Sequence, residues 1–213
     1  MDPERAVRTV IFDQDGTLIN TFIPALHAYS VVTGREITLA ELEPVAHLGA
    51  ARNLVSALLG REATDADDDV FHDALAAEVS AIEPYDGIVD LLKTLRERGI
   101  ATGLATNSDA RSATVVLGAH GFDALLDTIV SVDQVSGPKP SPESIELAVA
   151  NLGCGPEEVA FVGDSNADML AARAAGVLAV AAGWGHQAPG IDRAHVDVWL
   201  ETPGEVLELL LAG

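Results

Sequence analysis

The residues of this chain with the clearest potential for chemistry follow its first apolar run. Residues 7–12 lead directly into Asp13, and Asp15 and Gly16 come just after it. In a fully extended strand the two carboxylates would project to the same side. A glycine just past a strand more often begins a turn, where backbone N–H groups can converge on an anion and a carbonyl can face a cation. The pair is therefore suited to metal-assisted chemistry, although an Asp-Gly sequence that only closes a strand is the plainer interpretation of these residues alone.

Three later apolar runs also end in, or lead to, polar side chains. The polar residues are Thr106 to Asp109 after residues 100–105, Lys139 after residues 128–132, and Asp164 to Asp168 after residues 159–163. Each group has a structural explanation when it is taken singly. Thr106 or Ser108 can cap a helix, and Asp168 can favour a helix N-terminus. Lys139 can be a solvated loop residue. Independent capping does not explain why all these groups follow strands, and their carboxylates, hydroxyls and lysine together are suited to phosphoryl transfer.

The elements that must position these residues are predicted from an alternation of two patterns. Apolar runs of β-type composition cover residues 7–12, 100–105, 128–132, 159–163 and 177–182. Helical patterns cover residues 109–120 and 141–152 and also follow Asp164. This alternation predicts an α/β fold with a parallel sheet and crossover helices. In such a sheet ligands bind beyond the carboxyl ends of the strands, so the polar groups are expected at one edge.

The interval 20–84 breaks the alternation. It contains helical segments near residues 21–33, 39–48, 51–59 and 65–82, punctuated by glycines and without a convincing strand. We therefore predict an inserted all-helical domain at 20–84. The core domain is then formed by residues 1–19 and 85–213.

Composition narrows the function classes. The chain has 213 residues, of which 48% are hydrophobic, and 33 acidic against 12 basic residues give a formal net charge of −21. This charge would repel nucleic-acid phosphates and anionic lipids, so neither is expected as a partner. Cys154 is the single cysteine, which excludes an internal disulfide. With no apolar run of about 18 residues and no secretory pattern at the start, we expect a cytoplasmic protein.

Four motifs in this chain resemble those of the haloacid dehalogenase superfamily. They are Asp13-Gln14-Asp15-Gly16-Thr17, Thr106, Lys139, and Gly163-Asp164-Ser165-Asn166-Ala167-Asp168, in matching order and spacing. The resemblance covers essentially the whole chain and includes a helical cap after the first motif, as in the phosphoglycolate phosphatase and β-phosphoglucomutase branches. It implies a Rossmann-like parallel sheet flanked by helices, with the first strand central and the strand of the last motif beside it.

The resemblance also implies separate tasks for the two opening carboxylates. Asp13 would attack phosphorus and form an aspartyl-phosphate. Asp15 would first protonate the leaving oxygen and then activate the water that releases phosphate, since one positioned acid/base can serve both half-reactions.

Mg²⁺ is the cofactor that the resemblance implies. Its ligands would be the Asp13 carboxylate, the backbone carbonyl of Asp15 and Asp164, with Asp168 supporting them through water or from outside the first coordination sphere. The metal and Lys139 are electrostatic requirements, because an anionic nucleophile must approach a phosphate dianion.

The phosphoryl group itself would be held by short loops at the strand ends. The predicted contacts are Gly16, Thr106, Asn107 and Lys139, together with the nucleophile.

Substrate choice is expected to depend on the inserted helical segment, because closure over the core would place it against the non-phosphate end. Arg52 is the main candidate to bind a substrate carboxylate or second phosphate. His47, Asn20 and Thr21 are further candidates. Trp184 and His186 follow another strand end and could border the site.

The function predicted from these features is a Mg²⁺-dependent phosphatase for a small phosphomonoester, with phosphoglycolate as the best single substrate. One alternative is a sugar-phosphate phosphatase or a β-phosphoglucomutase-like enzyme that passes the phosphoryl group to a sugar. A remote alternative is a binding or regulatory protein without turnover, against which the complete motifs argue.

Overall fold

A six-stranded parallel sheet forms the centre of the larger lobe. The computed structural model describes residues 6–210, apart from the side chains of Glu43 and His47. In spatial order the strands are β5 (Thr128–Val130), β4 (Ala101–Ala105), β1 (Thr9–Phe12), β6 (Val159–Gly163), β7 (Leu178–Ala182) and β8 (Val198–Leu200). The predicted α/β fold is confirmed, with β1 central and β6 beside it.

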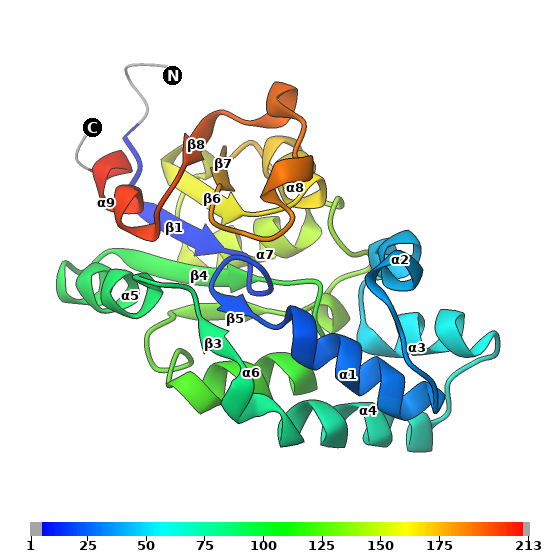
Figure 1. Ribbon diagram of the computed structural model, residues 1–213. Helices are drawn as coiled ribbons and strands as arrows, with labels where there is room; N and C mark the ends of the chain where they lie inside the picture. The colour runs from blue at the N-terminus through cyan, green and yellow to red at the C-terminus, as the bar shows by residue number, and fades with distance from the viewer. Residues whose placement is uncertain (1–5, 211–213) are drawn as a thin grey trace.

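Helices cover both faces of this sheet (Figure 1). One face carries α5 (Ile88–Glu97), α6 (Ala110–His120) and α9 (Val206–Leu209), and the other carries α7 (Glu143–Leu152) and α8 (Asn166–Ala174). Within β1, Val10 and Phe12 join the first hydrophobic cluster, whereas Ile11 joins the second. A strand buried on both faces must be apolar throughout, which explains why these runs do not alternate with polar residues.

The prediction of five strands missed β8. This edge strand has three residues, as β5 has, but the apolar run of β5 continues to Val132, whereas Asp197 and Glu201 directly flank β8. The sequence of β8 therefore lacks a longer apolar run. The 3₁₀ turns of the larger lobe are η3 (Val132–Gln134), η4 (Pro156–Glu158), η5 (Ala188–Gly190), η6 (Arg193–His195) and η7 (Pro203–Glu205).

The segment between β1 and α5 is mostly helical. It contains α1 (Phe22–Thr33), α2 (Leu39–Leu42), η1 (Glu43–Leu48), α3 (Ala51–Leu59), α4 (Asp65–Ala77) and η2 (Val79–Ala81). The expectation of no strand between 20 and 84 was wrong at its two ends, where β2 (Ile19–Asn20) pairs antiparallel with β3 (Glu83–Pro84). Each of these strands has two residues, too few to create a sequence pattern.

Helix α1 packs against α4, and Figure 1 shows the group α1 to α4 beyond the carboxyl ends of β1 and β4. Between residues 6 and 210 no helix is long and apolar enough to cross a bilayer.

Candidate active site

The polar groups predicted at four strand ends do line one cavity. It has a volume of about 670 Å³ and lies between the carboxyl edge of the sheet and the helices α1 to α4. Asp13, Thr106, Lys139, Asp164 and Asp168 all line it. Parallel strands explain this convergence, because their carboxyl ends lie at the same edge.

The turn after β1 has the glycine geometry that was predicted. Gly16 has φ +89°, its N–H donates to the carbonyl of Ile19 at 2.9 Å, and the N–H of Leu18 donates to the carbonyl of Gln14 at 2.9 Å. A Cβ atom on Gly16 would lie 2.3 Å from Oδ2 of Asp164. The turn therefore needs glycine both for its backbone conformation and for the close approach of a second carboxylate.

Asp13 and Lys139 form a buried ion pair. The Lys139 ammonium donates to Asp13 Oδ1, to the carbonyl of Ala105 at 2.9 Å, and lies 2.7 Å from Asp168 Oδ1. Burial raises the pKa of Asp13 well above its ordinary value, and Lys139 offsets only part of this effect. Burial alone would lower the pKa of Lys139, but the carboxylates of Asp13 and Asp168 outweigh it and raise that pKa. The lysine is therefore held as a cation.

Three buried carboxylates are suited to a divalent cation. One oxygen from each of Asp13, Asp164 and Asp168 lies within 4.8 Å of the others. Oδ1 of Asp164 is buried and has no hydrogen-bond partner among the described residues, while its Oδ2 accepts from the N–H of Gln187 at 3.0 Å. Burial, and then the charge of Asp168, raises the pKa of Asp164 to about 7. Lys139 compensates only one of the three carboxylate charges. Carboxylate oxygens are the ligands that Mg²⁺ prefers.

Asp168 has partners that hold its side chain. Its Oδ2 accepts from the hydroxyl of Ser165 at 2.6 Å and from the Ser165 N–H at 3.0 Å, which forms a capping box at the start of α8. The helix-capping explanation of this residue is thus correct, and the same carboxylate also reaches Lys139 with its other oxygen.

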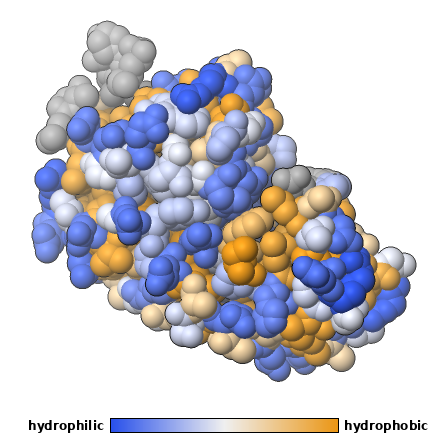
Figure 2. Space-filling model, viewed as in Figure 1, coloured by the Kyte–Doolittle hydropathy of each residue, from blue (hydrophilic) through white to orange (hydrophobic). Residues whose placement is uncertain are grey.

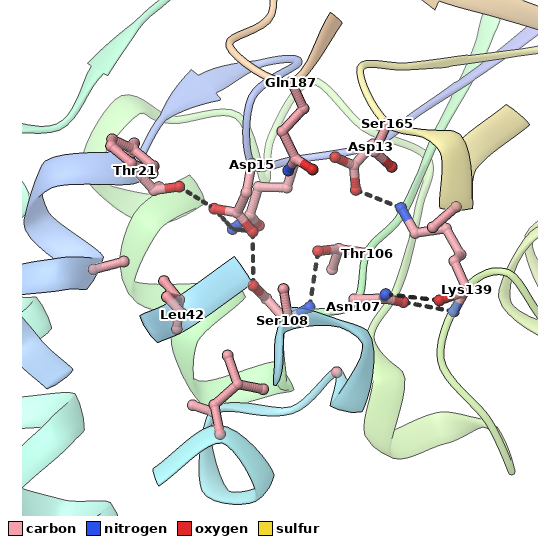
Figure 3. A pocket seen from close by; sticks show the side chains of 18 of the residues that line it. Asp13, Asp15, Thr21, Leu42, Thr106, Asn107, Ser108, Lys139, Ser165 and Gln187 are labelled. Carbon is pink, nitrogen blue, oxygen red and sulfur yellow. Dashed lines mark hydrogen bonds and ion pairs between the residues drawn. The ribbon is translucent and has the colours of Figure 1, made fainter. Parts of the chain in front are cut away.

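Asp15 is held by two hydroxyl groups on different elements. Thr21 donates to its Oδ1 at 2.6 Å and Ser108 donates to its Oδ2 at 2.7 Å (Figure 3). The amide of Gln14 lies 3.3 Å from both oxygens. The carboxylate orientation is therefore determined from the loop after β4 as well as from the residue before α1.

The loop after β4 also positions the backbone of Lys139. The Asn107 amide group donates to the carbonyl of Lys139 at 3.2 Å, and its Oδ1 accepts from the Lys139 N–H at 2.7 Å. Thr106 is buried, and its hydroxyl oxygen accepts from the N–H of Ser108 at 3.0 Å. The Asn107 side chain therefore fixes the position from which Lys139 reaches Asp13.

The predicted substrate contacts do not all reach the cavity. Thr21 lines the cavity, but Arg52 and Asn20 do not. The Arg52 guanidinium donates to the carbonyl of Ala63 at 3.0 Å and to Asp65 at 2.9 Å, and Asn20 accepts from the N–H of Phe22 at 3.4 Å. His47 belongs to η1, and its side chain lies outside the described part of the structure.

Two residues of the loop after β7 have different roles, one in the site and one in supporting the fold. His186 lines the cavity, with Nδ1 at 3.6 Å from Asp164 Oδ2 and its ring 4.9 Å from that of Phe22. Trp184 instead donates its indole N–H to the carbonyl of Thr17 at 2.9 Å and covers the first turn.

The sequence interpretation missed three contacts of the site. Ser108 was considered only as a helix cap, whereas the cap of α6 is Asp109. Gln187 was not considered, although it follows a strand end. The third contact joins the buried His72 of α4 to Asp109 at 3.0 Å, a pairing that no local pattern predicts.

Comparison with known proteins identifies the family. The sequence profile of the haloacid dehalogenase-like hydrolases matches residues 10–182. The N-acetylmuramic acid 6-phosphate phosphatase of Pseudomonas aeruginosa is 30% identical in an alignment that covers 96% of this chain and 95% of that protein. The phosphoglycolate phosphatase of Xylella fastidiosa is 32% identical over 84% of this chain and 82% of its own.

Solved structures show the same fold. CbbY from Rhodobacter sphaeroides in complex with phosphate has a TM-score of 0.85 with 22% identity, and the match covers 96% of this chain and 99% of that one. With the profile matching most of the chain and two phosphatases at 30% identity or more, the protein belongs to the haloacid dehalogenase-like hydrolase family, as one of its phosphatases.

Proposed function

We propose that this protein is a Mg²⁺-dependent phosphatase that hydrolyses a small phosphomonoester through an aspartyl-phosphate on Asp13. The observation that carries the proposal is the grouping of Asp13 with a buried lysine and two further buried carboxylates, while Asp15 is held at the same strand end. A nucleophile, a fixed cation, a divalent-cation site and a separate acid/base are the parts that the reaction needs.

The metal would be held by Asp13, by the backbone carbonyl of Asp15 and by Asp164, whose unpartnered oxygen favours such a ligand. Asp168 would support it through water or from outside the first coordination sphere, because it also pairs with Lys139. When bound, Mg²⁺ would neutralise the negative charge shared by the carboxylates and the phosphoryl oxygens.

In the first half-reaction an oxygen of Asp13 attacks phosphorus, and the bond from phosphorus to the leaving alcohol oxygen breaks. Asp15 donates a proton to that oxygen as it leaves. Lys139, Thr106 and the backbone N–H group of Asn107 hold the phosphoryl oxygens. Gly16, whose own N–H donates to Ile19, lets the turn pass close to them.

In the second half-reaction Asp15, now ionised, accepts a proton from water. The water oxygen attacks phosphorus and the bond to the Asp13 oxygen breaks, which releases inorganic phosphate and restores both carboxyl groups. Thr21 and Ser108 keep Asp15 in one orientation for both proton transfers.

Residues 20–84 would act as a cap over a core formed by 1–19 and 85–213. Closure of these helices over the cavity would exclude water until the alcohol has left. Phosphoglycolate, the substrate in the name of one relative, is the single substrate that the sequence predicts, and the lining of the cavity bears on that choice below. Transfer of the phosphoryl group to a sugar, as in a β-phosphoglucomutase-like enzyme, is the alternative outcome.

The test is release of inorganic phosphate from a panel of phosphate esters, with Mg²⁺ and with a chelator. Asp13→Asn should abolish turnover, whereas Asp123→Asn, at an exposed position remote from the cavity, should leave it unchanged. Acid-quenched wild type should carry one phosphoryl group on the peptide that contains Asp13. Turnover that persists with chelator or with Asp13→Asn would refute the mechanism, and a rearranged sugar phosphate in place of inorganic phosphate would indicate the mutase alternative.

A further inference from the structure

The wall that the helical segment contributes to the cavity is apolar. Its larger side chains are Phe22, Tyr29, Leu39, Leu42, Leu54, Phe71 and Leu75. Four of these residues are buried, and the rings of Tyr29 and Phe71 lie 4.7 Å apart between their centroids. Figure 2 shows apolar side chains gathered on the smaller lobe where it adjoins the larger one. With the phosphoryl group at Asp13, the rest of a substrate would lie against this wall.

The charges around the cavity are almost all negative. Five aspartates line it, namely Asp13, Asp15, Asp109, Asp164 and Asp168. Among the described lining residues Lys139 is the only lysine or arginine, and it already pairs with two of these carboxylates. A Mg²⁺ ion would still leave the lining residues with a net negative charge.

Two further residues near the cavity also add no positive charge to it. Burial, followed by the charges of Asp15 and Asp109, raises the pKa of the Tyr29 phenol, so this group enters the cavity uncharged. The Arg52 guanidinium, which could have met an anion, is bound to Asp65 and to the carbonyl of Ala63. No described arginine or lysine on the helical wall is therefore placed to receive a second anionic group.

We infer that the preferred substrate is the phosphate ester of an uncharged, largely apolar alcohol, without a carboxylate or second phosphate. The inference rests on the proposed phosphatase function and specifies its leaving group. Burying a second anion against an apolar wall without a cationic partner is unfavourable. The two phosphatases compared above are named for compounds that carry a carboxylate besides the phosphate, so this chain would differ from them in specificity.

The size of the cavity agrees with this class of substrate. Its volume of about 670 Å³ is in the range of pockets that bind ligands much larger than glycolate, roughly 300–1,000 Å³. Apolar surface on the alcohol would be removed from water by Leu42, Leu54 and Phe71. We expect specificity to increase as the apolar part of the alcohol becomes longer.

The first experiment compares substrates that differ only in charge or in length. Phosphoglycolate is paired with its amide, 2-amino-2-oxoethyl phosphate, and kcat/KM is measured from phosphate release with saturating Mg²⁺. The amide should be preferred by about tenfold or more, because only the carboxylate adds a charge that lacks a partner. In the series ethyl, butyl and hexyl phosphate, kcat/KM should rise about two- to fourfold for each added methylene.

The second experiment places a cation in the wall. Ala46 in η1 is exposed and lines the cavity, whereas Ala57 in α3 is exposed and does not. Ala46→Arg should shift the ratio of kcat/KM between phosphoglycolate and its amide towards phosphoglycolate by about tenfold. Ala57→Arg adds the same charge outside the cavity and should leave the ratio unchanged.

The outcomes separate the two proposals. If wild type hydrolyses phosphoglycolate as well as or better than its amide, or if kcat/KM does not increase along the alkyl series, the inferred leaving group is wrong while the phosphatase function stands. If the Ala46→Arg and Ala57→Arg variants shift the ratio equally, the wall does not determine the charge preference. If none of these esters is hydrolysed in a Mg²⁺-dependent way, the proposed function itself fails.

Discussion

Thr21, the residue immediately before helix α1, donates its hydroxyl hydrogen to Oδ1 of Asp15 at 2.6 Å. This bond ties the start of the helical segment to the proposed acid/base. Ser108 holds the other oxygen from the loop after β4. The orientation of Asp15 thus depends on both sides of the cavity, and it should be sensitive to the position of the helices.

Removing either hydroxyl should slow the chemical steps more than it weakens binding. We expect Thr21→Val and Ser108→Ala each to lower kcat by about tenfold, which corresponds to about 1.4 kcal/mol, because proton transfer needs a fixed carboxylate. KM should change little, because both hydroxyls donate to Asp15 and are not free to donate to a substrate. Steady-state kinetics with a saturating phosphate ester measures both constants.

Thr114, which lies in the same lobe as Ser108, provides the control for these variants. The Thr114 hydroxyl is exposed on α6 and donates to the carbonyl of Ala110, away from the cavity. Thr114→Val should leave kcat unchanged. An equal loss in this variant, or a loss confined to KM in the others, would show that the two hydroxyls do not act through Asp15.

Two glycines with similar backbone conformations allow a test of the first turn. Gly16 has φ +89° and Gly34 has φ +67°, so alanine is strained at both positions. Only at Gly16 would the added Cβ atom meet a neighbour, the carboxylate of Asp164 at 2.3 Å; at Gly34 nothing lies within 4 Å. Comparison of the two variants separates backbone strain from disturbance of the site.

We expect Gly34→Ala to cost about 1 kcal/mol of unfolding free energy with unchanged kcat. Gly16→Ala should lower kcat/KM by about a hundredfold or more, since it displaces the turn or the carboxylate at the predicted metal site. It should also raise the Mg²⁺ concentration needed for half-maximal activity. Urea denaturation and Mg²⁺ titration of the activity measure these effects, and similar losses in both variants would contradict the assignment.

The parts of the fold predictable from sequence are those where burial imposes composition. Five of the strands lie within longer apolar runs because helices cover both faces of the sheet. The edge strand Val198–Leu200 lacks this signal, and so does the two-residue pairing of Ile19 with Pro84.

Residues of the site were predictable where topology brings them together. Asp13, Thr106 and Asp164 follow strands that are neighbours in the sheet, so their positions follow from the α/β fold. The orientation of the Arg52 side chain was not predictable in this way, because its guanidinium donates to Asp65, which begins the next helix, α4. Side-chain pairing between helices is not encoded in a local pattern.

The two lysines of the chain offer a matched test of buried charge. Lys139 is buried among Asp13 and Asp168, whereas Lys93 is exposed on α5. Lys139→Met leaves buried carboxylates without their counterion and should lower the unfolding free energy by about 3–5 kcal/mol with chelator present. Lys93→Met should cost less than about 0.5 kcal/mol.

Mg²⁺ should narrow the difference between wild type and Lys139→Met, because the proposed metal would compensate the same carboxylates. Chemical denaturation with and without Mg²⁺ measures this effect. If Mg²⁺ stabilised Lys139→Met no more than wild type, lysine and metal would not share these ligands. Activity of Lys139→Met should remain lost in either case, since phosphoryl oxygens would still lack their fixed cation.

The contact between His72 and Asp109 predicts a pH-dependent attachment of α4 to α6. The His72 ring is buried, with Nε2 at 3.0 Å from Asp109 Oδ1 and Nδ1 at 2.8 Å from the carbonyl of Asp68. Burial alone would lower the pKa of His72, but Asp109 and Asp68 outweigh it and raise the pKa above its ordinary value of 6.5. The pKa of Asp109 is lowered, because His72 and Ser112 outweigh its burial.

A raised histidine pKa means that the folded state binds the proton more tightly than the unfolded state. The resulting stability is fully present below pH 6.5 and is lost as the pH rises through the folded pKa. We therefore expect His72→Gln to lower the unfolding free energy by about 2 kcal/mol at pH 6, and by clearly less at pH 9. Urea denaturation at both pH values measures the difference.

Arg111 joins the same two helices at the surface and supplies the comparison. It pairs with Asp69 at 2.7 Å and Asp73 at 3.7 Å, and its side chain is 45% exposed, against 4% for His72. Arg111→Ala should cost less than about 1 kcal/mol and should have little effect in high salt, because solvent and ions screen an exposed pair. Since arginine does not titrate in this range, its cost should be the same at pH 6 and pH 9. A cost of His72→Gln that did not change with pH would show that the ring acts through packing and not through its charge.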